Sequence, residues 1–501
     1  MAGNTLASKP PGWRHTPGDT LMRTIIEAGI GRWRSAVIDQ DGFPARLTFH
    51  DSNTVSPIGS IVDARVRQVN ARLDMVFLDL GPLGEGVMNR RRARQRVKGA
   101  VKRLSDCAHE GECLRVQVLS DPGVLETGKA LSVTPRARLV GRYVVAECLS
   151  ARDGNSTGKL SLSNDLPPKR ARALDAALSP LTAQAGVNLI VRSRAASVDD
   201  AFVIMEAERL TKPLSAPLET GTLYSPALID LALTAVEDGD VPVQFADRAS
   251  LTQARTVTAD RYPDLSARLD IHPAGMAAFE EDGVEDALQE ALADRIVLPS
   301  GGWLSIHETP ALTAIDVNMG AALAAHGPQE AIRRVNLEAA LAIAHHLDFQ
   351  DIGGLIVTDF IDMRAKDAVA DLTATLDAAL GEHKTPVERT GLSRFGLMEL
   401  RRARSGLSLR QRLLTRPATP GGPNAAAQAL SLLQQAQRLG RQAQPGTLTM
   451  AAPEAVTAWL DARPELIRAL EQDSLRQVVV KTADTVSVTI QETGRTGTVT
   501  A

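Results

Sequence analysis

Cysteine is scarce in this chain of 501 residues. The three cysteines, Cys107, Cys113 and Cys148, are too few for a disulfide framework and show no spacing typical of a metal site. The stretch MAGNTLASKPPGWRHTPGDT at the N-terminus lacks the apolar core of a signal peptide. No window approaches the roughly 18 consecutive apolar residues of a membrane span. We therefore expect a soluble, cytoplasmic protein.

Aromatic residues make up only 3% of the chain, whereas the apolar fraction of 44% is ordinary for a globular protein. With about 150 residues for each domain, the length predicts about three domains. The net charge of −3 argues against indiscriminate binding to nucleic acid, but the charges are unevenly distributed. The run NRRRARQRVKGAVKR, residues 89–103, carries eight cationic side chains and no acid. Such a run is either a solvated face or a surface that contacts a polyanion.

Two stretches of strand-like sequence suggest places where RNA or phosphate could bind. From Gly59 to Met88, apolar and polar residues alternate in short blocks separated by glycine-bearing turns, which predicts a β-meander and a small barrel. Barrels of the OB type bind oligonucleotides and stack bases on aromatic side chains, and Phe77 is the one aromatic residue of this block. Further along, a strand ends at Val191 and delivers Arg192 and Ser193, which suit a phosphate oxygen. Core packing of Phe77 and a surface ion pair of Arg192 are the alternatives.

Two strands that end in an acid point to the chemistry. The sequence LTAIDVN ends an apolar strand at Asp316, an amphipathic helix follows from Pro328, and LIVTD ends a second strand at Asp359. Strands joined by such a crossover are parallel, so both carboxyl ends lie at one edge of the sheet. Two carboxylates held together repel each other unless a cation lies between them, and magnesium suits one or two carboxylates with phosphate oxygens. Asn318 would orient a carboxylate or donate to a phosphate.

The alternative is that Asp316, Asn318 and Asp359 are turn residues. A nearby acid, Asp362, precedes a helical run and is interpreted as the N-cap of that helix.

Three motifs in this order, ETPALTAIDVN, IGGLIVTDFIDM and GLSRFGLMELRRAR, resemble those of the bacterial RNase E/RNase G family of endoribonucleases. The resemblance implies a multidomain α/β and β protein. The parts that it implies are a flexible N-terminus (1–20), an RNase H-like domain in two pieces (21–55 and 237–290), an OB-fold RNA-binding domain (56–135), a 5′-end sensor domain (136–236), a DNase I-like catalytic domain (291–413), a linker (414–445) and a small C-terminal α/β domain (446–501).

The resemblance also implies roles for individual residues. Asp316 and Asp359 would bind Mg²⁺, with Mn²⁺ as the alternative, and Asn318 would complete the catalytic set. Arg192 and Ser193 would bind the 5′-phosphate of the RNA. The residues that would contact RNA elsewhere are Phe77, Arg90, Arg91, Arg92, Arg94, Arg96, Lys98 and Arg394.

The sequence departs from the family pattern in three places. Where the family carries a Cys-Pro-x-Cys zinc link, this chain reads LTRPATPGGPN, so we expect no zinc and a homodimer rather than a zinc-linked tetramer. Val87 stands where the family has a second barrel aromatic. No long scaffold follows the small domain, so we expect the compact, RNase G-like form.

The sequence thus predicts a magnesium-dependent endoribonuclease that cleaves single-stranded RNA, such as rRNA precursors and mRNA. The products would carry 5′-phosphate and 3′-hydroxyl ends, and 5′-monophosphorylated substrates would be favoured. The alternative is a non-catalytic RNA-binding or ribosome-associated protein with the same fold. A phosphatase of small substrates is disfavoured by the barrel and the basic run.

Overall fold

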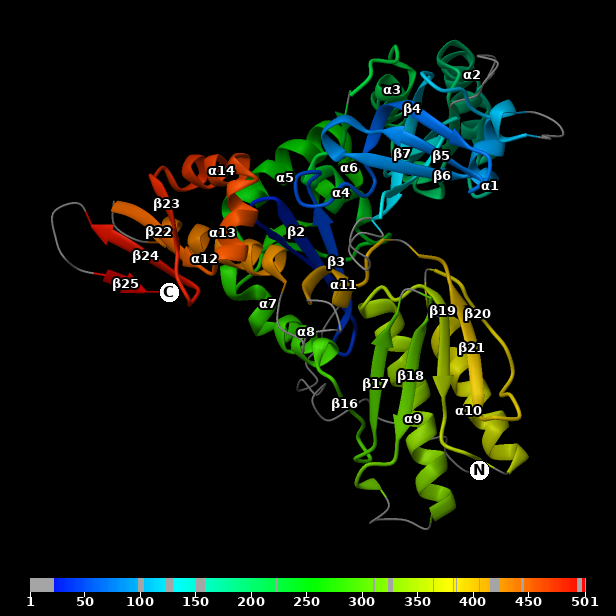
Figure 1. The fold of residues 1–501 in the computed structure, drawn as a ribbon, viewed down its shortest axis with the longest axis vertical. Helices are drawn as coiled ribbons and strands as arrows, with labels where there is room; N and C mark the ends of the chain where they lie inside the picture. Colours follow the sequence, from blue (N-terminus) through cyan, green and yellow to red (C-terminus); the bar gives the residue numbers. More distant parts are fainter. Residues whose placement is uncertain are drawn as a thin grey trace. The chain divides into compact units, whose positions relative to one another are not determined.

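The computed structural model describes residues 22–97, 103–121, 129–149, 158–221, 223–309, 311–322, 328–363, 365–381, 383, 385–404, 406–414, 424–442, 446–492 and 498–500 (Figure 1). The chain divides into two compact units. Unit 1 comprises Met1–Ile25, Ser35–Thr48 and Pro273–Ala429, and unit 2 comprises Ile26–Arg34, Phe49–His272 and Leu430–Ala501. Among the helices of the described ranges, none is both long enough and apolar enough to cross a membrane.

Unit 1 contains a six-stranded sheet with the strand order β16-β17-β18-β19-β21-β20 (Figure 1, green to yellow). Strands β18 and β19 are parallel, and the other neighbours are antiparallel. This confirms the predicted strand, helix, strand unit. The strands are β16 (Ile296–Val297), β17 (Trp303–Glu308), β18 (Thr313–Asn318), β19 (Gly354–Asp359), β20 (Val387–Arg389) and β21 (Leu397–Arg402).

Two long helices, α9 (Pro328–Phe349) and α10 (Lys366–Gly381), pack on one face of this sheet. That face is apolar because every second strand residue turns inward, as Ile315 and Val317 do in β18. The helices contribute matching apolar stripes that include Val335, Ile343 and Leu376. The carboxylates of β18 and β19 are therefore left on the opposite face. Shorter helices of unit 1 are α7 (Ala278–Glu281), α8 (Val284–Leu292) and α11 (Leu409–Leu413).

Unit 2 contains a closed barrel in which β4, β5, β6, β8 and β7 follow one another and β4 pairs again with β7. The mixed α/β chain with this barrel fits an OB-like domain, as predicted from the β-meander. Val62, Val76, Leu78 and Val116 are fully buried in its core. The elements are β4 (Ile61–Asn70), β5 (Met75–Asp79), β6 (Glu85–Asn89), α1 (Arg90–Ala93), β7 (Cys113–Ser120), β8 (Leu131–Thr134) and the edge strand β13 (Leu223–Tyr224).

A four-stranded sheet of order β11-β12-β10-β9 follows the barrel in the chain. Leu189 and Val191 of its strand β12 are fully buried, and they share one core with Leu174 and Leu178 of α2 and Val203 of α3. The strand that the sequence predicts before Arg192 is confirmed as β12. The elements are β9 (Arg136–Val140), β10 (Val144–Leu149), β11 (Leu160–Leu162), α2 (Pro168–Ala185), β12 (Asn188–Val191) and α3 (Asp200–Ser215).

A five-stranded sheet of order β15-β14-β1-β2-β3 combines strands from before and after the barrel in the chain. Its strands are β1 (Arg23–Ala28), β2 (Arg32–Ile38), β3 (Pro44–Asp51), β14 (Val243–Phe245) and β15 (Leu269–Ile271). The helices near the last two strands in the sequence are α4 (Leu228–Ala235), α5 (Arg248–Arg261) and α6 (Pro263–Ser266).

The C-terminal part forms a four-stranded sheet of order β23-β22-β24-β25 (Figure 1, orange to red). Met450, Val456 and Leu470 are buried there. Its elements are α12 (Ala425–Gln442), β22 (Gly446–Ala452), α13 (Glu454–Asp461), α14 (Pro464–Ser474), β23 (Val478–Thr482), β24 (Ser487–Glu492) and β25 (Thr498–Thr500).

Candidate active site

Asp316 and Asp359 lie directly opposite each other near the carboxyl ends of β18 and β19, with β18 continuing for two residues to Asn318. The two strands are parallel, and the last paired residues are Asp316 and Asp359. Both are exposed, because they occupy the outward positions of strands whose inward residues are buried. The juxtaposition that the sequence predicts at one edge of the sheet is therefore present in the structure.

Asn318 lies two residues after Asp316 and on the same face of the sheet. Its Nδ2 donates a hydrogen bond of 2.7 Å to Oδ2 of Asp316. This bond fixes the orientation of the carboxylate and leaves the other carboxylate oxygen, Oδ1, without this constraint. The amide of Asn318 therefore helps to orient the carboxylate of Asp316.

Asp362 is a third acid near the pair, and its predicted role was wrong. Helix α10 begins at Lys366, so Asp362 is too far from the helix start to be its N-cap. Gly396, which has a positive φ of 80°, lies close to both acids. A Cβ at Gly396 would lie 3.1 Å from Oδ1 of Asp362 and 3.9 Å from Oδ1 of Asp359. The turn before β21 therefore packs against both acids.

The electrostatics of the pair favour a cation. Although Asp359 is exposed, the protein around its carboxyl displaces some water and raises its pKa, and the negative charges of Asp316 and Asp362 raise it further. A divalent cation bound to the two carboxylates would relieve this repulsion. Among the described residues, no group of three or more His, Cys, Asp or Glu side chains is arranged to hold a metal ion. Mg²⁺ does not require such a group, because it keeps several waters and binds substrate phosphates.

The predicted phosphate-binding residues, Arg192 and Ser193, follow directly after β12. The guanidinium of Arg192 is half-buried, and its Nη1 donates a hydrogen bond of 2.7 Å to the carbonyl oxygen of Gly141. Ser193 is exposed and begins a short 3₁₀ turn. Arg194 is ion-paired with Asp238, so the two arginines differ in their partners. Within the described part of the chain the Arg192 side chain forms no other hydrogen bond, so its further N–H groups can bind an anion.

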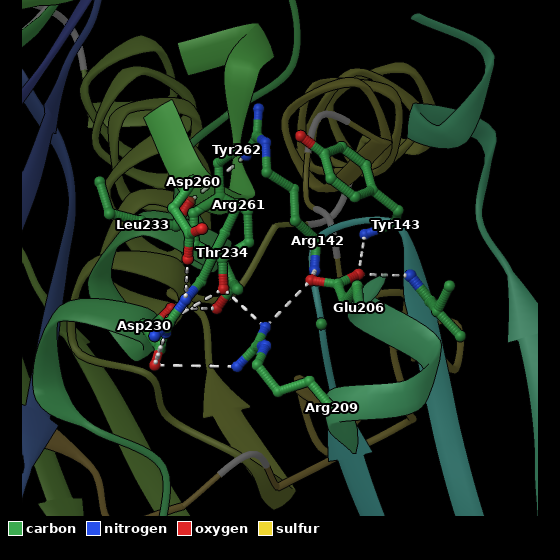
Figure 2. A network of polar contacts seen from close by, with 12 residues as sticks. Arg142, Tyr143, Glu206, Arg209, Asp230, Leu233, Thr234, Asp260, Arg261 and Tyr262 are labelled. Atoms are coloured by element: carbon green, nitrogen blue, oxygen red, sulfur yellow. Dashed lines mark hydrogen bonds and ion pairs between the residues drawn. The ribbon is translucent and has the colours of Figure 1, made fainter. Parts of the chain in front are cut away.

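A buried carboxylate that the sequence analysis missed holds the turn beside Arg192. Glu206 of α3 is 3% exposed and accepts hydrogen bonds from the backbone N–H groups of Arg142, Tyr143 and Val144, at 2.9, 2.6 and 2.8 Å (Figure 2). A Cβ at Gly141 would lie 2.5 Å from Cδ of Glu206, so only glycine fits there. The carbonyl that binds Arg192 belongs to this fixed turn.

The polar network around Glu206 includes ion pairs of two arginines, Arg209 and Arg142. Arg209 contacts Glu206 at 3.4 Å and Asp230 at 3.8 Å, and Figure 2 shows both contacts. The side chain of Arg142 is ion-paired with Asp264 at 2.5 Å. The buried charges of Arg142, Glu206 and Asp230 are therefore paired, as their burial requires.

Phe77 of the barrel is partly exposed on β5, and its paired residue on β6 is Val87. Directly opposite residues of an antiparallel pair project from the same face. The position at which the family would have a second aromatic therefore lies beside Phe77, and here it is aliphatic.

The residues of the basic run differ in their surroundings. Arg91 and Arg94 are exposed, Arg90 is ion-paired with Asp74 at 3.3 Å, and Arg92 donates to the hydroxyl of Ser132. Lys98 lies outside the described residues.

Arg96 is placed differently from the other arginines of the run. It is 3% exposed and binds Glu112 and the carbonyl oxygen of Cys107. This gives Arg96 a structural role within the barrel, so our proposal for the RNA-binding surface leaves it out.

Arg394 is exposed on the turn before β21, and its guanidinium lies 4.5 Å from the centre of the Phe395 ring. The predicted linker lies mostly outside the described residues. The cysteines Cys107, Cys113 and Cys148 are free.

Comparison with known proteins assigns the chain to a class. A sequence model of the Ribonuclease E/G family matches residues 138–405, more than half of the chain. Ribonuclease G of Haemophilus influenzae is 28% identical over 370 residues, which cover 70% of this chain and 73% of that protein. Ribonuclease G of Escherichia coli K12 is 27% identical over 374 residues, with 70% and 74% coverage. Ribonuclease E of Synechocystis is 28% identical over 345 residues, with 66% and 48% coverage. The matched range contains Arg192, Asp316 and Asp359.

Proposed function

This chain belongs to the Ribonuclease E/G family, and from that premise we propose that it cleaves single-stranded RNA with Mg²⁺ held by Asp316 and Asp359. Family membership confirms the prediction of an enzyme that is an endoribonuclease. The observation that carries the proposed site is the register that sets the two carboxylates opposite each other. A protein that only bound RNA would gain nothing from two acids where a phosphate must approach, because like charges repel.

The side chains of the site divide the work. Asp316 and Asp359 would hold the metal, and Asn318 would keep the Asp316 carboxylate in its orientation through the 2.7 Å hydrogen bond. Bound Mg²⁺ would polarise the scissile phosphate and lower the pKa of a coordinated water. Attack of water oxygen on phosphorus would break the bond to the 3′ oxygen, and the proton would pass to that leaving group. The products would carry 5′-phosphate and 3′-hydroxyl ends.

A 5′-monophosphate would be recognised by Arg192 and Ser193. A guanidinium forms strong, charge-assisted hydrogen bonds with phosphate, and a neighbouring hydroxyl adds a further donor. The hydrogen bond from Arg192 to the carbonyl oxygen of Gly141 holds the guanidinium in place before the RNA binds. Substrates with a 5′-monophosphate would therefore be cleaved faster than those with a 5′-hydroxyl.

The remaining parts of the proposal rest on the family resemblance. The barrel and the exposed arginines Arg91 and Arg94 would hold the strand electrostatically. We further propose that the substrates are rRNA precursors and mRNA in the cytoplasm, and that the protein acts as a homodimer. We also propose a DNase I-like architecture for the domain with the six-stranded sheet β16-β17-β18-β19-β21-β20, and an RNase H-like architecture for the domain with the five-stranded sheet β15-β14-β1-β2-β3.

Cleavage of a short single-stranded RNA by the Asp316→Asn variant tests the site. We expect cleavage to fall by at least about 100-fold, because the variant removes one of two anionic ligands. Glu399→Gln is the matched control, since Glu399 is an exposed acid on the same face, opposite Val357 in the paired strands. We expect Glu399→Gln to cleave at the unmutated rate. Cleavage that survives Asp316→Asn would disprove the assignment of this residue.

A further inference from the structure

Phe395 is an exposed aromatic residue in a chain with few aromatics. Its side chain is 68% exposed, and the guanidinium of Arg394 covers one face of its ring at 4.5 Å. Because this phenyl ring is not packed in a core, its surface is available for contact with another π-surface. The positive charge on one ring face leaves the other face for a ligand.

The turn that carries Phe395 is fixed by hydrogen bonds. The hydroxyl of Ser393 accepts from the backbone N–H groups of Phe395 and Leu397, at 3.3 and 3.2 Å. The backbone of Ser393 also donates to the carbonyl of Leu397 at 2.8 Å and accepts from the N–H of Gly396 at 3.1 Å. Four bonds therefore hold the backbone from which the ring projects.

This turn adjoins the candidate metal site. Leu397 is the residue paired with Asp359 across β21 and β19. Gly396, between Phe395 and Leu397, is the residue whose added Cβ would approach oxygens of Asp359 and Asp362. Phe395 thus immediately precedes the position at which an added Cβ would approach the two acids.

A second aromatic on the other side of the acid pair serves a different purpose. Trp303 of β17 is paired with Asn318, but it is only partly exposed. Arg295 covers its ring at 4.5 Å, and a Cβ at Gly320 would lie 3.2 Å from its Cδ1. Trp303 is therefore enclosed by Arg295 and by the turn at Gly320, whereas the residue Phe395 is 68% exposed.

We propose that Phe395 is a stacking surface for one nucleobase next to the scissile phosphate of a single-stranded RNA. The inference rests on the proposed function, because it needs the phosphate at Asp316 and Asp359. Bases stack on aromatic rings with little regard to sequence, and each such contact is worth about 1–3 kcal/mol. Stacking would splay one base from its neighbour and fix the phosphate between them over the carboxylates. Phe395 would then determine where the strand is cut.

The test is a cycle that combines a protein change with a substrate change. One set of RNAs carries a single abasic nucleotide, moved stepwise through the positions around one defined cleavage site. The proteins are unmutated, Phe395→Leu, and Phe395→Trp to restore stacking. Val297→Ala is the control, because Val297 is also an exposed apolar residue of this sheet, with 62% exposure. The readout is kcat/KM.

For the unmutated protein we expect kcat/KM to fall by roughly 5- to 150-fold when the abasic nucleotide occupies one particular position, in line with the loss of one stacked base. Phe395→Leu should lose a similar factor on intact RNA and nothing further on that abasic RNA. Phe395→Trp and Val297→Ala should behave like the unmutated protein. Losses that multiply independently at every position would overturn the proposal. The proposal would also be overturned if Phe395→Leu changed the mass of the assembly in solution and its loss of kcat/KM did not depend on the position of the abasic nucleotide. That result would assign the ring to a protein interface.

Binding separates failure of this inference from failure of the proposed site. The fluorescence of RNA with 2-aminopurine at the identified position should rise when the RNA binds Asp316→Asn, because the base leaves its stack with the neighbouring bases, and should not rise when it binds Asp316→Asn with Phe395→Leu. A rise in the absence of any cleavage by the unmutated protein would support the stacking surface and refute the proposed function. An equal fluorescence response with both variants would refute the stacking surface alone.

Discussion

The residues Asp316 and Asp359 are direct neighbours across two parallel strands; Asp359 is the last residue of β19, and Asp316 lies two residues before the end of β18. Neither residue is charge-compensated by a cationic ion pair within the described part of the chain. A carboxylate pair of this kind repels an approaching phosphate unless a cation intervenes. Binding of RNA and cleavage of RNA should therefore respond differently to changes at the pair.

We expect Asp316→Asn to retain RNA affinity, or to bind slightly more tightly, while its cleavage is lost. The substitution removes one negative charge from the path of the phosphate and leaves the barrel unchanged. Fluorescence anisotropy of a labelled single-stranded RNA in EDTA measures this affinity. Affinity that falls more than about tenfold would show that Asp316 holds the fold or the RNA itself.

Arg192→Ala should erase the preference for 5′-monophosphorylated RNA over 5′-hydroxyl RNA. The guanidinium is already anchored at Gly141, so its removal takes away the charge-assisted contact without disturbing the buried Glu206. Competition between the two RNAs in one reaction measures the preference. Arg136→Ala is the control, because Arg136 is an exposed arginine of the same sheet, paired with Glu147 at 3.1 Å. Equal rates for both RNAs with the unmutated protein would remove the sensor from the account.

Val87→Phe should strengthen binding of single-stranded RNA by about 1–3 kcal/mol, or roughly 5- to 150-fold. The new ring would project beside Phe77, its partner in the paired strands. Val87→Leu adds apolar volume without a π-face and is the matched control. Binding measured at several salt concentrations should show an unchanged slope, since no phosphate contact is added. A gain of the same size in Val87→Leu would indicate that apolar area, and not stacking, is responsible.

The stability of the protein should fall in mild acid because of His346. This residue is 1% exposed within α9, and burial lowers the pKa of its imidazole to about 3. The unfolded chain takes up the proton near pH 6.5, so the contribution to stability is complete above that pH and is lost as the pH falls toward 3.

Between pH 7 and pH 5 we expect this residue to reduce the free energy of unfolding by about 2 kcal/mol. In His346→Leu that part of the pH dependence should be absent, whatever the stability of the variant at pH 7. Urea unfolding at the two pH values provides the comparison, with the exposed His307→Asn as control. An identical pH dependence in His346→Leu would contradict the assignment.

The acid pair could be predicted from the sequence because a helical crossover dictates parallel strands and the two-residue period of a strand dictates which side chains face outward. The position of Asp362 could not, since it depends on a helix start that lies a few residues later than the sequence suggests. A shift of this size at a helix end is ordinary, because end positions depend on local capping.

Glu206 and Arg96 show a different limit of sequence reasoning. A charged residue is read as exposed by default, yet both are buried with specific partners. For Glu206 a signal was available: it lies three residues after Val203 and four before Leu210, on the buried stripe of α3. For Arg96 the signal is the pairing with Glu112, which only the closed barrel brings into reach.

Cleavage of a short 5′-monophosphorylated single-stranded RNA, with Mg²⁺ and with EDTA, by the unmutated protein and by Asp359→Asn, tests the central claim most directly. The account predicts internal cuts with 5′-phosphate ends that require Mg²⁺ and are lost in Asp359→Asn. Cuts that persist in EDTA, or that Asp359→Asn makes at the unmutated rate, would contradict a metal site at the paired carboxylates.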